Sequence, residues 1–288
     1  MRYRWELALI AVAAVWGSTF VLVQDAVERT PPFLFLALRF GVAALALAVA
    51  GAFRGLRRDE LLAGGIIGVA LFAGYGFQTV GLQYTSPTNA GFITGLFVVL
   101  TPLFGAALLR HLPSAGAALG ALLATGGLVL LAMPSGFTVA RGDALVLACA
   151  ASFAIHILLI ARLGEGRSVI RLAGVQIATT AVASALWSLG GERAPMPTDG
   201  LVWFAIALTG LLATAAAFWI QTGAQRQIPP TRTAVILSAE PAFAGVFGYL
   251  VAGDRLGARG MLGAGLIMAG ILAAELLAPS RERVTETV

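Results

Sequence analysis

Ten apolar stretches of near-membrane-spanning length divide this sequence, and they constrain its fold more than any other feature. A helix needs about 20 consecutive apolar residues to cross the hydrocarbon core of a bilayer. Because unpaired backbone groups are strongly unfavourable in hydrocarbon, we predict that each stretch is an α-helix. The stretches are Trp5–Gln24, Phe33–Phe53, Leu61–Gln83, Asn89–Leu109, Ala115–Met133, Asp143–Ala161, Val169–Leu189, Leu201–Gln225, Arg232–Ala252 and Gly260–Leu277.

The composition also indicates a membrane protein. Of the 288 residues, 59% are hydrophobic and 11% are charged, whereas a soluble domain carries roughly 25% charged residues. All 19 basic residues are arginines, and most lie in short connections, where they indicate topology rather than a nucleic-acid-binding patch. The first apolar stretch continues to Val23, so we interpret it as an uncleaved membrane span rather than a signal peptide.

The second half of the chain repeats the first at an offset of 143 residues. At that offset Gln78-Thr79 aligns with Gln221-Thr222, and the 50 positions from 78 to 127 contain 13 identities without a gap. Two-fold repeats are typical of secondary transporters. We therefore predict one membrane domain built from two five-helix repeats, residues 1–140 and 141–288.

The odd number of spans per repeat decides how the repeats are related. The second repeat must enter the membrane from the opposite side, so the two repeats are inverted around a central cavity. With both termini in the cytoplasm, thirteen arginines fall on the cytoplasmic side and five on the other side, and Arg39 lies within a span. The positive-inside rule therefore predicts cytoplasmic termini.

Polar residues within the spans are the candidates for solute binding, because polar groups in hydrocarbon are unfavourable and commonly functional. Tyr75, Gln78 and Thr79 share one helix face, and Gln221 and Thr222 share the matching face of the eighth span. Two interpretations remain open for these stripes. They either face each other across a solute pathway or form interhelical hydrogen bonds that hold the bundle together.

Glu240-Pro241 in the ninth span is the most unfavourable pair to bury. Glu240 lies about 12 Å into that helix, and either couples protons, binds a solute amine, or makes a structural contact. Pro241 is expected to kink the helix, and Pro102 is the comparable candidate hinge in the fourth span. Arg39 either neutralises a substrate carboxylate or pairs structurally.

Three further side chains are candidates for the cavity lining. His156 in the sixth span either senses protons or makes a satisfied polar contact. Trp16 and Trp219 lie inside predicted helices, away from the interfacial belt, and either line a cavity for an aromatic solute or face lipid. The spacing Gly116/Gly120 indicates close helix packing, with a weak dimer interface as the alternative to a monomer.

Several motifs are missing from the sequence, and their absence narrows the class. There is no phosphate-binding glycine-lysine loop and no HExxH sequence, and Cys149 is the single cysteine. No cofactor or metal site is therefore predicted. Ser152 and His156 share a helix face, but no serine elbow or oxyanion site accompanies them, so an intramembrane enzyme remains a remote alternative.

Short motifs along nearly the whole chain resemble the drug/metabolite transporter superfamily in its ten-helix EamA-type branch. Asp254 stands where the family pattern has glutamate, and Leu109-Arg110-His111-Leu112, the first-repeat counterpart, lacks an acid. The matching segments are Trp16–Phe20, Leu36–Phe40, Tyr84–Pro87, Leu100–Pro102, Glu240-Pro241 and Gly253–Leu256.

This resemblance implies an exporter or exchanger of small metabolites in a bacterial-type inner membrane. Such carriers commonly move amino acids, purines or drugs. Together with the aromatic candidates Trp16, Tyr75 and Trp219, it favours export of amino acids, including aromatic ones. An importer, or an exchanger of a drug, purine or sugar derivative, remains the alternative.

Overall fold

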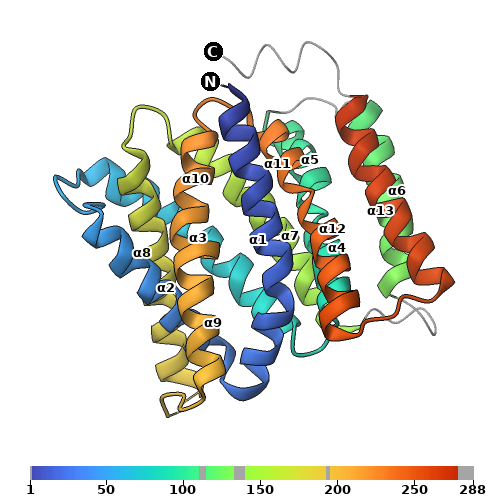
Figure 1. The fold of residues 1–288 in the computed structure, drawn as a ribbon. Coiled ribbons are helices and arrows are strands. Elements are labelled where there is room, and N and C mark those ends of the chain that lie inside the picture. Colours follow the sequence, from blue (N-terminus) through green and yellow to red (C-terminus); the bar gives the residue numbers. More distant parts are fainter. Residues whose placement is uncertain (1, 110–114, 133–139, 193–194, 278–288) are drawn as a thin grey trace.

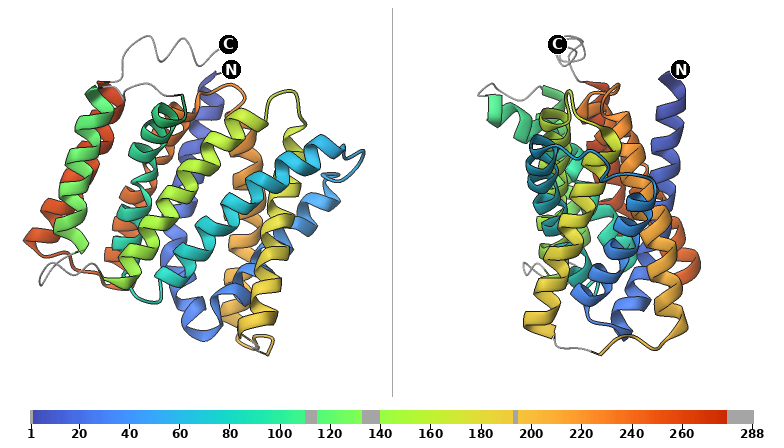
Figure 2. Two further views of the ribbon diagram at one scale, coloured as in Figure 1. Left: turned by 180° about the vertical axis from the view of Figure 1, so that it is seen from behind. Right: turned by 90° about the vertical axis from the view of Figure 1, so that its left-hand side faces the viewer.

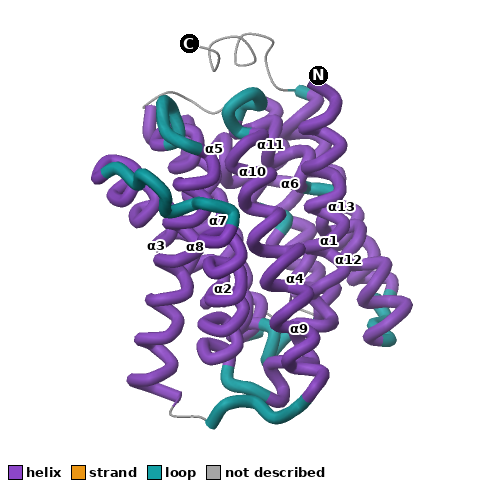
Figure 3. The backbone as a smooth tube through the Cα atoms, turned by 60° about the vertical axis from the view of Figure 1, so that its left-hand side comes forward, coloured by secondary structure: helices purple, strands orange, loops and turns teal. Residues whose placement is uncertain are grey.

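The protein is an all-α integral membrane protein with ten transmembrane helices arranged as two inverted repeats. A computed structural model describes residues 2–109, 115–132, 140–192 and 195–277. Figure 3 shows that helices joined by short connections make up the described chain. The end of the fifth predicted span at Met133, and Arg110, Arg193, Arg281 and Arg283 of the topology count, lie outside these residues.

The helices reproduce the ten predicted spans, three of which are interrupted. Eight spans meet the length and hydropathy of a membrane crossing, and α6 and α13 form the other two. The first repeat contains α1 (Arg2–Arg29), α2 (Pro32–Val49), α3 (Arg58–Gly81), α4 (Pro87–Thr94), α5 (Phe97–Leu109) and α6 (Ala115–Ala132). The second contains α7 (Arg141–Leu163), α8 (Val169–Trp187), α9 (Gly200–Gly210), α10 (Ala217–Ala224), α11 (Pro230–Leu237), α12 (Glu240–Phe247) and α13 (Ala258–Leu276), with π-helical turns η1 (Ser188–Glu192), η2 (Leu211–Ala216) and η3 (Gly248–Ala252).

Several helices begin a residue or two before the predicted boundary because proline starts them. Pro32, Pro87 and Pro230 lie in the first turns of α2, α4 and α11, where the missing N–H has no helical partner to lose. The first helix is also longer than predicted, since it continues past Gln24 to Arg29. Its polar last turn is compatible with a position outside the hydrocarbon core.

Helix contacts between the repeats follow the inverted symmetry. Helix α1 packs against α10 and α12, and its repeat mate α7 packs against α3 and α5, which are the mates of α10 and α12. Helices α2 and α8, which are mates of each other, pack together. The beginning of α1 and the end of α13 lie at the same end of the bundle (Figure 1), as an even number of spans requires.

The fourth and ninth spans are broken at matching positions. Helix α4 ends and α5 begins around Gly95, and α11 ends and α12 begins around Ser238, which is the same site at the 143-residue offset. The two breaks meet, because a Cβ atom placed on Gly95 would overlap Cγ of Pro241. Pro102, the predicted hinge of the fourth span, lies inside α5, which continues through it.

Helices α6 and α13 form a pair at one side of the bundle (Figures 1 and 2). A Cβ atom on Gly127 would lie 2.5 Å from the Gly263 carbonyl oxygen, and one on Gly270 would lie 2.6 Å from the Gly120 oxygen. Gly116 likewise faces Ala273 and Leu277. The small residues of α6 therefore bring two helices of the same chain into backbone contact.

Candidate solute-binding site

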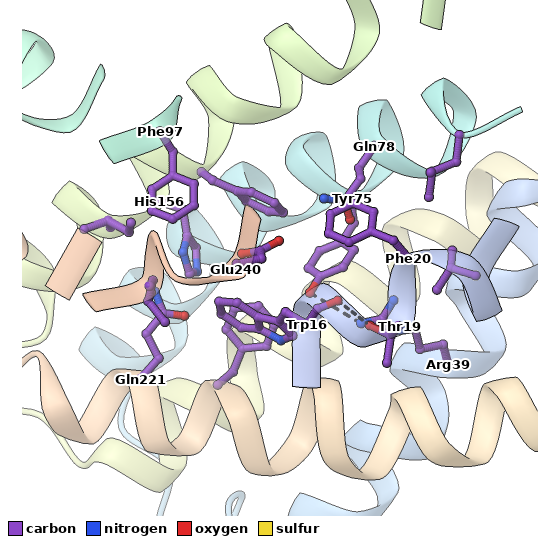
Figure 4. A pocket seen from close by; sticks show the side chains of 16 residues that line it. Trp16, Thr19, Phe20, Arg39, Tyr75, Gln78, Phe97, His156, Gln221 and Glu240 are labelled. Carbon is purple, nitrogen blue, oxygen red and sulfur yellow. Dashed lines mark hydrogen bonds between the residues drawn. The ribbon is translucent and has the colours of Figure 1, made fainter. Parts of the chain in front are cut away.

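A central cavity of about 40 Å³ lies between the repeats. It is bounded by α1 and by both broken spans, together with α2, α3, α7 and α10 (Figure 4). Aromatic and aliphatic side chains dominate its wall, and two ionisable groups of opposite charge lie among them. The lining residues are Trp16, Thr19, Phe20, Val23, Arg39, Tyr75, Gln78, Leu82, Phe97, Phe153, His156, Ile157, Phe218, Gln221, Leu237 and Glu240.

The Arg39 guanidinium is held by neutral groups. Its Nε donates a 2.9 Å hydrogen bond to Oγ1 of Thr214, and Nη2 donates to the Tyr75 hydroxyl at 3.4 Å. The guanidinium carbon lies 4.7 Å from the centre of the Tyr75 ring, in cation–π geometry. Arg39 is only 3% exposed. No carboxylate in the described ranges forms an ion pair with it. The site therefore contains a fixed positive charge without an anionic partner.

Glu240 supplies the carboxyl group of the site. It is the first residue of α12 because the ninth span breaks at Ser238–Ala239, and it is 3% exposed. The amino end of a helix favours a negative charge, and the break places that end of α12 at this carboxyl group. Throughout the described part of the chain no side chain donates a hydrogen bond to it or forms an ion pair with it. In Figure 4 it lies near the middle of the cavity.

Aromatic rings form much of the remaining wall. The ring centres of Trp16 and Phe218 are 5.4 Å apart, and Tyr75 makes edge-to-face contacts with Phe40, Phe153 and Phe218 at 5.0, 5.3 and 6.0 Å. Such contacts stabilise the arrangement beyond simple burial. The rings are thus packed into a rigid wall before any solute binds.

The π-helical turn η2 positions both Trp16 and Arg39. The Trp16 indole Nε1 donates a 2.7 Å hydrogen bond to the Ala213 carbonyl, and Thr214 accepts from Arg39. Both acceptors belong to η2 (Leu211–Ala216). A π turn widens the helix and changes which backbone groups are available, which is why such turns are frequent at functional sites. The hydrophobic pattern gave no sign of this turn, so Thr214 was not among the predicted residues.

Only part of each predicted stripe, Gln78-Thr79 and Gln221-Thr222, reaches the cavity. Gln78 and Gln221 both line the cavity, from opposite repeats. Thr79 and Thr222 do not line it and are buried among the helices. The Gln78 amide donates to Thr94 at 3.3 Å, whereas Oε1 of Gln221 is buried without a hydrogen-bond partner in the described chain. Gln221 therefore offers a free acceptor close to the cavity.

His156 lines the cavity and begins a chain of buried hydrogen bonds. Its Nε2 lies 2.7 Å from Oε1 of Gln176, and Nε2 of Gln176 donates to Thr222 at 3.1 Å. Because the Gln176 amide nitrogen is committed to Thr222, its oxygen faces the histidine, which then carries its proton on Nε2. Gln176 was not predicted, although a glutamine within an apolar span was a signal for it.

Trp219 does not belong to the cavity. Trp219 is 49% exposed on the outside of α10. Of the two interpretations given for it, a side chain that faces lipid fits this position. Ser152 donates its hydroxyl to the Ala148 carbonyl rather than to His156, and the two residues form no nucleophile–base pair. Within the described ranges, no three histidine, cysteine, aspartate or glutamate side chains are grouped as metal ligands.

Two inverted repeats of membrane-spanning helices around a central cavity that contains polar groups define the class of this protein as a membrane transporter. The chain belongs to the EamA-like transporter family, whose pattern matches residues 3–133 and again residues 140–275.

Similar proteins extend over nearly the whole chain. An uncharacterized transporter of Archaeoglobus fulgidus is 34% identical over 94% of this chain and 85% of its own length. The uncharacterized transporter YyaM of Bacillus subtilis is 25% identical over 93% of this chain and 92% of its own length. One crystal structure with 25% sequence identity covers 96% of this chain and 99% of the other, with a TM-score of 0.71.

Proposed function

We propose that this transporter exports amino acids, aromatic ones included, by alternating access. The observation that carries the proposal is the presence of Arg39 and Glu240 in one cavity, each without an ionic partner in the described chain. An amino acid is a zwitterion, so its carboxylate and ammonium groups match the two charges. Burying an unpaired charge is strongly unfavourable, and a bound zwitterion would neutralise both groups at once.

The rest of the wall supports an aromatic or large apolar side chain. Trp16, Tyr75, Phe153 and Phe218 supply flat apolar surfaces, which pack well against aromatic solutes. The free Oε1 of Gln221 is positioned to accept a hydrogen bond from an ammonium or an indole N–H. A phosphorylated solute is disfavoured, because a dianion would meet one arginine and a carboxylate.

We propose that the protein lies in a bacterial-type inner membrane with both termini in the cytoplasm. The thirteen arginines on that side, against five on the other, support this orientation. A partial relative, the uncharacterized inner membrane transporter YedA of Escherichia coli, is 33% identical over 36% of this chain. The direction of transport follows from the resemblance to exporters, and the carrier acts as a monomer or weak dimer.

Counterflow in reconstituted liposomes tests the proposal. Liposomes preloaded with unlabelled phenylalanine or tryptophan should take up the labelled amino acid, and phenylalanine amide, which lacks the carboxylate, should compete at least about tenfold more weakly. A pH gradient applied across the same liposomes shows whether protons exchange with the solute. Absence of counterflow for every amino acid would contradict the proposed substrate class.

A further inference from the structure

A second cavity lies at the end of the bundle where α1 begins and α13 ends. It has a volume of about 470 Å³ and is bounded by the end of α7, the end of α10 and the connection between α10 and α11. These connections lie at the same end as the N-terminus in Figure 1. Its wall includes Ile160 and Gly164 from α7, and Thr222, Gln225 and Arg226 from or next to α10.

One helical turn separates this cavity from the central one. On α7, Ile157 lines the central cavity and Ile160 lines the second. On α10, Gln221 lines the central cavity and Gln225 the second. Three or four residues of helix correspond to about 5 Å. The two cavities are therefore consecutive compartments along the same pair of helices, with a thin partition between them.

Neutral hydrogen bonds between helices hold the partition closed. The Gln225 amide donates to the backbone carbonyl of Ile157 at 2.9 Å and thereby joins α10 to α7. The Gln176 amide donates to Thr222 at 3.1 Å and joins α8 to α10. Gln176 and Thr222 are 0% and 2% exposed. Hydrogen bonds of this kind contribute modestly in a membrane bundle, so the partition is closed yet can separate without a large barrier.

We propose that this partition is the inner gate of the transporter and that the second cavity is the vestibule through which solute enters from the side of the termini. Separation of α10 from α7 and α8 at Gln225 and Thr222 joins the two cavities into one pathway. The inference rests on the proposed transport of a solute through the central cavity. It assigns Gln225, Thr222 and Gln176 to gating, a role distinct from contact with solute.

Thiol labelling tests the gate without any solute. Cys149, the single native cysteine, is first replaced in Cys149→Ser, and Ile157→Cys then places a reporter at the central cavity. This substitution leaves the backbone carbonyl that Gln225 contacts in place. A membrane-impermeant maleimide is added to membranes whose terminal side faces the reagent. A second reporter, Ala161→Cys in the vestibule, measures access to the vestibule itself.

We expect the cysteine at 161 to react quickly in every background and the cysteine at 157 to react slowly in the parent. Adding Gln225→Leu should accelerate labelling at 157 about three- to tenfold, the effect of losing one interhelical hydrogen bond. The matched control is Gln227→Leu, the same chemical change at an exposed residue of the same vestibule. It should leave both rates unchanged.

Gln176→Leu removes the second contact and should also accelerate labelling at position 157. This second variant tests the gate if Gln225→Leu does not yield folded protein. Equal labelling of positions 157 and 161 in the parent would show that no gate exists there. Unchanged labelling at 157 in the folded variants would overturn the assignment of these residues. Because labelling needs no solute, failure of the gate and failure of amino-acid transport give separate results.

Discussion

The two broken spans share a backbone design but carry different chemistry. Each breaks at the same place in the repeat, and the first residue after each break lines the central cavity. That residue is Phe97 in the first repeat and Glu240 in the second, and the two match at the 143-residue offset. The duplication therefore preserved the backbone break while the side chains diverged, and only the second repeat supplies a carboxyl group at this position.

Helices α3 and α10 repeat this lesson. Thr79 is buried with no hydrogen-bond partner in the described chain, whereas its mate Thr222 accepts from Gln176. Leu82 corresponds to Gln225, which joins α10 to α7. At the opposite end of the bundle a residue of α1 makes the corresponding link, since Gln24 donates to the Leu82 carbonyl at 3.0 Å. The shared fold thus uses different polar contacts at its two ends.

The largest expected effect comes from filling the crossing of the two broken spans. A Cβ atom on Gly91 would overlap Cβ of Ala244, so Gly91→Val should destabilise the fold by about 1–3 kcal/mol or more and abolish transport. Thermal unfolding in detergent and counterflow measure the two effects. Gly65→Val is the matched control, because nothing lies within 4 Å of a Cβ atom there; equal damage from both variants would contradict the crossing.

Removing the charge of the second repeat should weaken solute binding next most strongly. Glu240→Gln keeps the shape of the side chain but removes a charge-assisted hydrogen bond to the ammonium, so affinity should fall roughly 10- to 100-fold. Phe97→Leu, at the matched position of the first repeat, should change affinity less than about threefold, because it trims only apolar contact. Equilibrium binding of labelled phenylalanine measures both, and similar losses would show that the two halves contribute alike.

Arg39 should discriminate solutes by their carboxylate. Arg39→Gln should weaken phenylalanine binding about tenfold or more, because a charge-assisted bond is lost, and should leave phenylalanine amide nearly unaffected. Competition binding with the acid and the amide compares the two directly. If the variant loses both solutes equally, the guanidinium supports the wall through Tyr75 and Thr214 rather than the carboxylate.

The smallest expected difference separates the two threonines. Thr79→Val should be neutral or slightly stabilising, because this hydroxyl has no hydrogen-bond partner in the described chain. Thr222→Val should destabilise by about 1 kcal/mol, since it leaves the buried Gln176 amide unpaired. Melting temperatures of the two variants in the same detergent provide the measurement. Equal shifts would remove the distinction between α3 and α10.

Much of the site was predictable from charge and periodicity. Arg39, Glu240, His156, Gln78 and Gln221 stand out as polar residues in apolar spans, and all of them line the cavity. The remaining features depend on contacts that no local pattern encodes. Trp219 and Trp16 are both tryptophans within spans, yet one faces outward and the other donates to Ala213 of a distant helix.

The sequence by itself determined the ten spans and their inversion, because backbone polar groups in a membrane must form helices and an odd repeat must reverse direction. Only the tertiary structure decided where the helices break and which polar groups meet. Nothing in the local pattern pointed to the break at Gly95, where Pro241 of the other repeat approaches too closely for a side chain. Breaks, π turns and gates depend on packing between segments far apart in the chain, which neither hydropathy nor periodicity records.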